Sequence, residues 1–183
     1  MDKFSYFYVG MLVLYKLTEN FFLYRIGAAK RKPAKDWTIY LLAASFLAVL
    51  AAPFGEHLCC RTVPHTGEMV TGSLFLLAGT VIRARGLVDL GRNFSMAIEK
   101  LPGHSLVAKG LYRCLRHPLY LGNILLFLAC PLMLGGRWSW LVTAGGIAVV
   151  LWRLKTEERF LAEHLPGYRD YMRRTWRLIP WVY

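Results

Sequence analysis

The chain has 183 residues, of which 56% are hydrophobic and only 19% are charged. A soluble domain of this length would have to bury an unusual share of its chain to hide so much apolar surface, so we expect the excess to face a bilayer. The composition excludes a disordered chain, and the length allows one compact unit. The formal net charge of +12 fits nucleic acid, an anionic membrane face or an anionic ligand, and its placement along the chain decides between them.

Five apolar segments predict helices, because each is long, rich in Leu and Ala, and free of alternation between apolar and polar residues. They are residues 4–24, 37–52, 69–82, 119–134 and 138–152. Several are shorter than the roughly 20 residues of a straight bilayer crossing, so flanking residues must complete them or the membrane must thin. Residues 135–137 alone join the last two, which predicts a tight antiparallel hairpin. We therefore predict an all-α integral membrane protein with five transmembrane helices.

The basic residues gather between alternate apolar segments. Residues 25–36, 83–118 and 153–183 together hold 19 of the 23 Lys and Arg residues, which predicts that these regions are cytoplasmic. The N-terminus is then outside and the C-terminal region inside. The first segment lacks the features of a cleaved signal, so we interpret it as the first membrane helix. This distribution accounts for most of the charge without nucleic acid, and the four cysteines have no metal-ligand spacing.

Two cytoplasmic regions hold the candidate site. Residues 90–122 are dense in Gly, His, Tyr, Asn and Pro. Pro118 favours the first turn of a helix, which places Arg116 and His117 at a helix N-terminus, where backbone N–H groups can hold a carboxylate. Because residues 119–152 are predicted to form a hairpin, we expect Glu157 and Glu158 to return to the same membrane face as His117 and Tyr120. Taken singly, such residues are more often lipid-facing or structural, so the functional interpretation depends on their joint spacing.

These motifs resemble the isoprenylcysteine carboxyl methyltransferase family over residues 90–180. The resemblance rests on Leu90-Gly91-Arg92-Asn93-Phe94-Ser95, His104-Ser105-Leu106-Val107, Gly110-x-Tyr112, Arg116-His117-Pro118-x-Tyr120-x-Gly122, Glu157-Glu158-x-x-Leu161, Gly167-Tyr168-x-x-Tyr171 and Leu178-Ile179-Pro180. Phospholipid methyltransferases and some membrane sterol reductases carry similar motifs.

The resemblance implies a membrane enzyme that transfers a methyl group from S-adenosylmethionine, leaving S-adenosylhomocysteine. The acceptor would enter from the bilayer, and the family's named acceptor is the carboxylate of an isoprenylated cysteine. Carried over by position, the cofactor pocket would be lined by His104, Ser105, Leu106, Val107, Tyr112, His117, Pro118, Leu119, Tyr120 and one of Glu157 or Glu158. Arg153 would orient the acceptor carboxylate and act with the glutamates as the catalytic set. The choice between Glu157 and Glu158 depends on a one-residue gap near Pro166 and stays open.

The chemistry fits these residues, since methyl transfer mainly requires alignment of donor and acceptor. A carboxylate acceptor is already ionised and needs only a cation to hold it, whereas an amine or a thiol must first lose a proton. The alternatives are a phospholipid, amine or thiol methyltransferase, a sterol-type reductase, and a non-catalytic protein that binds anionic lipid. We expect no obligate protein partner and one membrane domain, residues 1–183, with three helices in 1–89 and the cofactor-binding half in 90–183.

Overall fold

The computed structural model describes residues 2–27, 36–99 and 105–183. Over these residues the chain is helical and contains no β-strand. The α-helices are α1 (Lys3–Arg25), α2 (Trp37–Cys60), α3 (Thr66–Leu90), α4 (Pro118–Leu134), α5 (Ser139–His164) and α6 (Tyr168–Arg174), and the short 3-10 helices are η2 (Gly91–Asn93) and η3 (Gly110–Arg113). Four of the predicted apolar segments fall inside α1 to α4, and the fifth begins one residue before α5, so the helical character of all five is confirmed.

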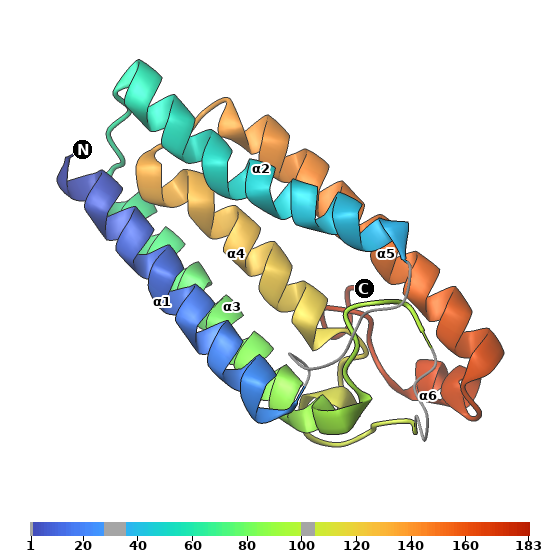
Figure 1. Ribbon diagram of the computed structural model, residues 1–183. Helices are drawn as coiled ribbons and strands as arrows, with labels where there is room; N and C mark the ends of the chain where they lie inside the picture. Colours follow the sequence, from blue (N-terminus) through green and yellow to red (C-terminus); the bar gives the residue numbers. More distant parts are fainter. Residues whose placement is uncertain (1, 28–35, 100–104) are drawn as a thin grey trace.

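Helix α4 forms the centre of the bundle. It contacts each of the other four long helices, and Figure 1 shows it between α1 and α2. Leu126, Phe127, Cys130 and Leu134 are buried along it. Helices α4 and α5 pack against each other as the predicted hairpin, with Gly135 in the left-handed conformation at the end of α4. The most apolar of the helices is thus covered on all sides by its neighbours.

Helices α3 and α4 approach each other closely at two glycines. A Cβ atom on Gly79 would lie 2.8 Å from the carbonyl oxygen of Gly122, and a Cβ atom on Gly122 would lie 2.8 Å from the carbonyl oxygen of Gly79. Small residues allow such backbone contact between apolar helices. The contact also brings Arg83, one turn after Gly79, against the first turns of α4.

Helices α1 and α2 are joined at the end of the bundle where α1 begins. The Nε2 atom of His57 lies 3.0 Å from the Asp2 carboxylate, and the Tyr8 hydroxyl donates to the Leu50 carbonyl at 2.8 Å. The ring of Tyr8 also stacks on Phe54. These contacts close one end of the space between the two helices.

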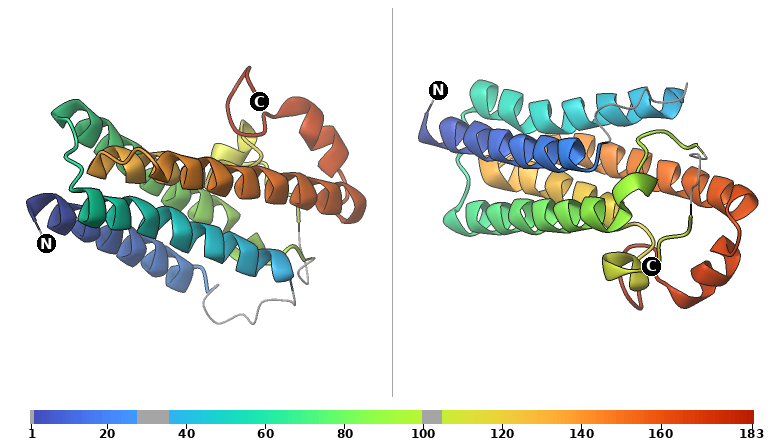
Figure 2. Two further views of the ribbon diagram at one scale, coloured as in Figure 1. Left: turned by 90° about the horizontal axis from the view of Figure 1, so that it is seen from above. Right: turned by 60° about the horizontal axis from the view of Figure 1, so that its bottom comes forward.

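At the opposite end, the polar segments of the chain come together. Figure 2 shows η3, α6 and the C-terminal residues gathered there, beside the last turns of α5. Helix α5 extends well past its apolar part, because residues 153–164 are mostly polar but continue the helix. The sequence prediction that Glu157 and Glu158 converge with His117 and Tyr120 is therefore confirmed.

In the described part of the chain, α2 alone is both long and apolar enough to cross a membrane by those two criteria, while α4 is apolar but has only 17 residues. The other long helices carry charged residues such as Glu19, Arg83 and Arg153. Large apolar side chains are nevertheless exposed along α1, α2 and α3, among them Leu17, Leu47 and Leu74. Such extended apolar surface is typical of contact with lipid or a partner.

Candidate active site

The two neighbouring glutamates of α5 face different surroundings. Successive residues of a helix point about 100° apart, so the side chains of Glu157 and Glu158 point toward different neighbours. Glu157 lines a cavity and accepts a hydrogen bond from the Tyr120 hydroxyl at 2.6 Å. Glu158 is buried outside the cavity wall, and its two oxygens accept from Arg116 Nε at 2.7 Å and Arg177 Nε at 2.8 Å.

Glu158 holds the C-terminal segment against the start of α4. Besides its two arginine partners, its Oε1 atom lies 3.3 Å from His117 Nε2. Burial alone would raise the pKa of Glu158, but the nearby His117 and Arg116 outweigh it and hold that pKa at about 2. Glu158 is therefore an ionised anchor for the cations around it.

The backbone N–H groups just before α4 also bond the C-terminal segment. The N–H groups of Arg116 and His117 donate to the carbonyls of Trp176 at 2.7 Å and Arg177 at 3.1 Å. The expectation that these amides hold a ligand carboxylate is wrong, because the C-terminal segment takes them. The side chains of Arg116 and His117 still reach the cavity wall.

Tyrosines form much of the polar end of the cavity. Tyr171 is fixed by donating to the Tyr112 carbonyl at 2.7 Å. Burial raises the pKa of Tyr112 well above its ordinary value, with the nearby Glu157 adding to the effect. Tyr168 lines the cavity, and its buried hydroxyl has no hydrogen-bond partner within residues 2–27, 36–99 and 105–183. A buried hydroxyl without a partner is costly, so this group fits a polar ligand.

Residues 93–99 and 105–107, which follow α3, line another part of the cavity. Ser105 N donates to the Asn93 side chain at 3.1 Å, which ties residues 105–107 to η2. Ser95 donates to Glu99 at 2.5 Å in the same loop. Ser105, Leu106 and Val107 all line the cavity, so the predicted motif lies where a bound ligand would meet it.

The cavity has a volume of about 520 Å³ and two unlike parts. The polar part is formed by the residues described above. The apolar part continues between α1 and α2, where it is lined by Leu23, Ile39, Leu42, Ala43, Phe46, Leu47 and Leu50. A polar chamber joined to an apolar channel can hold a polar and a lipophilic ligand next to each other.

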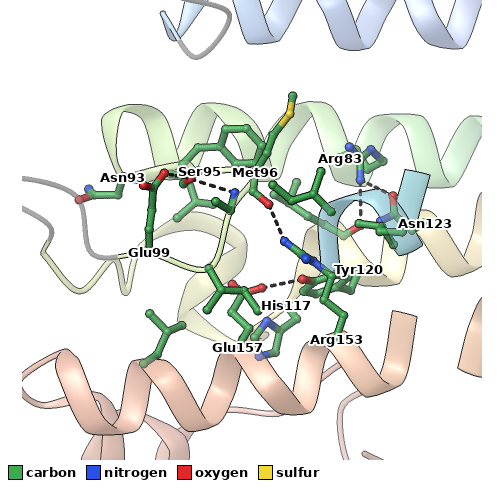
Figure 3. A pocket seen from close by; sticks show the side chains of 18 of the residues that line it. Arg83, Asn93, Ser95, Met96, Glu99, His117, Tyr120, Asn123, Arg153 and Glu157 are labelled. Carbon is green, nitrogen blue, oxygen red and sulfur yellow. Dashed lines mark hydrogen bonds between the residues drawn. The ribbon is translucent and has the colours of Figure 1, made fainter. Parts of the chain in front are cut away.

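Two arginines, Arg83 and Arg153, line the cavity (Figure 3). The Arg153 side chain donates to the Met96 carbonyl at 2.5 Å and also bonds Asp36 and Thr38. Arg83 donates to the Leu119 carbonyl at 3.2 Å and also bonds Asn123 and Glu19, but its buried Nε has no hydrogen-bond partner among the described residues. Both arginines are thus held by several protein contacts, but Arg83 also has one N–H group, at Nε, that makes no hydrogen bond to the described residues.

Comparison with known proteins assigns the fold to a family. The family model described as "Isoprenylcysteine carboxyl methyltransferase (ICMT) family" matches residues 72–163, which is half of the chain. The chain belongs to the isoprenylcysteine carboxyl methyltransferase family. The matched residues run from α3 to the last turns of α5, so they include most of the polar part of the cavity but not its apolar part between α1 and α2.

The relatives differ in the acceptor that their names state. The chain is 32% identical over 102 residues to protein-S-isoprenylcysteine O-methyltransferase A of Arabidopsis thaliana, covering 55% of this chain and 46% of that protein. It is 42% identical over 72 residues to methanethiol S-methyltransferase of Mycobacterium tuberculosis, covering 39% and 29%. The chain spans about half the length, or less, of these two relatives.

The fold matches that of a solved member of the family. The structure of the eukaryotic intramembrane Ras methyltransferase ICMT superposes with a TM-score of 0.69 at 19% identity, covering 96% of this chain and 65% of that one. At this identity the likeness concerns the fold alone. It supports a common helical bundle.

The structure brings most of the predicted residues of this family member to one cavity. Ser105, Leu106, Val107, Tyr112, His117, Leu119, Tyr120, Arg153 and Glu157 line it. Glu158 and Pro118 lie outside the wall, and Pro118 packs toward Gly86 of α3. His104 lies outside the described residues. Their roles toward a cofactor stay predictions.

Sequence reasoning missed Arg83, Glu19, Asn123 and Tyr168 as cavity residues. A signal existed for the first two, because Glu19 interrupts an apolar helix and Arg83 directly follows an apolar segment. Charged residues at membrane depth commonly face a bundle interior or a cavity.

Proposed function

We propose that the chain transfers the methyl group of S-adenosylmethionine to the carboxylate of an isoprenylated cysteine. One observation carries this proposal: a single cavity joins a polar chamber, built from the family motifs, to an apolar channel between α1 and α2. The family membership and the name of the Arabidopsis thaliana relative support the same reaction.

The polar chamber suits the donor. S-Adenosylmethionine has hydroxyl, amino and carboxylate groups and supplies an activated methyl group when bound. In the described part of the chain the Tyr168 hydroxyl has no hydrogen-bond partner, and Glu157 presents a carboxylate at the wall, so each has capacity for a ligand hydrogen bond. Ser105, Leu106 and Val107 would cover the donor from the opposite side. The described residues fit this ligand.

Arg83 is the residue that we propose for holding the acceptor carboxylate. It lines the cavity together with residues of both parts, and none of the residues that the structure describes accepts a hydrogen bond from its Nε. A carboxylate is ionised at neutral pH, so charge-assisted hydrogen bonds can orient it without a general base. Arg153 would instead keep the wall in place through its bonds to Asp36 and Met96. The protein's main contribution is then the alignment of the two reactants.

A small thiol is the second candidate acceptor, favoured by the 42% identity to the methanethiol S-methyltransferase. A thiol usually has to ionise before it attacks. The long apolar channel favours the lipophilic acceptor, because a one-carbon thiol would leave most of that channel unfilled.

We further propose five membrane crossings with residues 25–36, 83–118 and 153–183 in the cytoplasm. Helices α1 to α5 run the length of the bundle, and apolar side chains are exposed along α1, α2, α3 and α5, which surround α4. Three exposed cysteines offer a test: Cys59 and Cys60 end α2, while Cys114 follows η3. In sealed vesicles of known orientation, a membrane-impermeant maleimide should label Cys114 only from the cytoplasmic side and the other two only from the opposite side. Labelling of all three from one side would refute this topology.

The function itself is tested in two steps. Calorimetry with S-adenosylhomocysteine in detergent should show saturable binding, and no heat from folded protein would exclude the donor site. Methyl transfer from labelled S-adenosylmethionine is then measured to prenylcysteine, phospholipid, amine and small-thiol acceptors, with nicotinamide cofactors as competitors. We expect transfer to prenylcysteine and no competition. Preferred transfer to another acceptor would replace the proposed substrate, and donor-independent lipid binding would indicate a non-catalytic protein.

A further inference from the structure

The channel wall on α2 is a single continuous stripe. Its members are Ile39, Leu42, Ala43, Phe46, Leu47 and Leu50, which recur every three or four residues and therefore lie on one face of the helix. The stripe begins beside Arg153 and Asp36, at the mouth of the polar chamber, and runs toward the far end of the bundle.

The stripe ends at a contact between α1 and α2. Leu50 is the last α2 residue of the cavity wall, and its carbonyl accepts the Tyr8 hydroxyl at 2.8 Å. Tyr8 is 2% exposed and its ring stacks on Phe54, one turn beyond Leu50. Farther along, His57 and Asp2 hold the helices together. The Tyr8–Leu50 contact therefore stands at the far end of the channel, next to its last wall residue on α2.

The length of the channel follows from helix geometry. Ile39 and Leu50 are eleven residues apart, which corresponds to about 16 Å along the axis of α2 at a rise of about 1.5 Å per residue. An extended chain advances about 1.2 Å per single bond, so this length holds roughly 13 bonds, or about three isoprene units.

We propose that the Tyr8–Leu50 contact is a length stop that limits the acceptor's apolar chain to about three isoprene units. This inference rests on the proposed function and adds a residue-level basis for acceptor selection. A longer chain would have to bend out between α1 and α2. Since lipid tails are as apolar as the channel, burial of the extra carbons gives little gain, and packing at the stop decides the preference.

Shortening the channel is the first test. Ala43→Phe adds a ring to the middle of the stripe, whereas Ala44→Phe adds the same ring to the neighbouring exposed position outside the wall. Methyl transfer is measured to cysteine derivatives that carry two, three or four isoprene units. Ala43→Phe should lower the kcat/KM ratio of the three-unit over the two-unit acceptor by about tenfold, a loss within the range for misfitting apolar groups. Ala44→Phe should leave that ratio unchanged.

Lengthening the channel is the second test. Tyr8→Ala removes the ring behind Leu50 and should raise the relative kcat/KM of the four-unit acceptor by about tenfold. Leu76→Ala is the matched control, because Leu76 is a buried α3 residue that does not line the cavity. Affinity for S-adenosylhomocysteine should be the same in all four variants, which reports that each one is folded.

The outcomes distinguish the length stop from the proposed function. Transfer to prenylcysteine with an unchanged chain-length profile in both Ala43→Phe and Tyr8→Ala would overturn the length stop and leave the proposed function intact. A profile that Leu76→Ala or Ala44→Phe shifts equally would also overturn it. If the wild-type protein methylates no prenyl acceptor, the proposed function fails and the length stop fails with it.

Discussion

The guanidinium of Arg153 meets the carboxylate of Asp36 across α5 and α2, with Nη1 3.2 Å from Oδ2. Asp36 also accepts hydrogen bonds from the backbone N–H groups of Thr38 at 2.9 Å and Ile98 at 3.0 Å. Burial alone would raise the pKa of Asp36, but these hydrogen bonds and Arg153 lower it below its ordinary value. The pair thus joins α2, α5 and the loop over the cavity at one point.

Asp36→Asn should weaken the contact between Arg153 and α2 without removing any residue that lines the polar chamber. The loss of one charge-assisted contact costs about 1.5 kcal/mol, so we expect kcat for methyl transfer to fall about tenfold. Affinity for S-adenosylhomocysteine should stay close to the wild-type value. Asp170→Asn is the control, since its pair with Arg173 is exposed and worth little. Equal kinetics in the two variants would show that Asp36 does not position the site.

The two glutamates should respond differently to alanine. Glu157→Ala removes a cavity carboxylate and the acceptor for the Tyr120 hydroxyl, so calorimetry should show S-adenosylhomocysteine binding weakened about tenfold. Glu158→Ala leaves Arg116 and Arg177 without their shared partner, and should reduce the free energy of unfolding by about 3 kcal/mol. A denaturation curve that ranks Glu157→Ala as the less stable variant would contradict these assignments.

The pH dependence of the protein's stability should reflect protonation of the Glu158 carboxylate. Its pKa is about 2 in the folded protein against 4.5 for an ordinary glutamate. The unfolded chain therefore binds more protons between these values, and the stabilisation is complete above about pH 4.5 and is lost as pH falls toward 2. In detergent, the Tm of the wild type should decline across this window. Glu158→Gln should start from a lower Tm and decline less steeply, and parallel curves would count against this anchor.

How much of this could be predicted from the sequence depends on the range of each interaction. Helical periodicity and the short 135–137 link are local, so the five helices and the hairpin could be predicted. The family motifs placed Tyr120 near the glutamates, but one sequence does not give the rotation of α5, which decides that Glu157 rather than Glu158 faces the cavity. The Asp36–Arg153 pair joins residues 117 apart, and no local pattern announces such a contact.

The position of Arg83 at the cavity could not be predicted from the sequence for a different reason. An arginine at the end of an apolar segment normally extends to the lipid headgroups, and this interpretation is reasonable for a sequence alone. The Gly79–Gly122 contact changes it by bringing α3 against α4, where Asn123 and the Leu119 carbonyl receive the Arg83 side chain. The partners of Arg83 thus come from tertiary packing.

Arg83 should decide whether the acceptor must carry a carboxylate. Replacing it alone would leave Glu19 as a poorly paired charge, which could destabilise the bundle. The informative variant is therefore Arg83→Gln with Glu19→Gln, which replaces both charges by neutral groups. We expect it to fold, to bind S-adenosylhomocysteine with near wild-type affinity, and to raise KM for prenylcysteine by about tenfold to a hundredfold, the range of a lost hydrogen bond to a charged group.

A pair of inhibitors sharpens this test. Prenylcysteine analogues with a carboxylate or a neutral amide at the same position are compared as competitors of the acceptor. The wild type should prefer the carboxylate, and the double variant should lose that preference while it keeps its affinity for the amide. Arg159→Gln is the control, because Arg159 is exposed on the same end of the bundle and does not line the cavity. A preference that survives in the double variant would assign the carboxylate to another cation, with Arg153 the next residue to test.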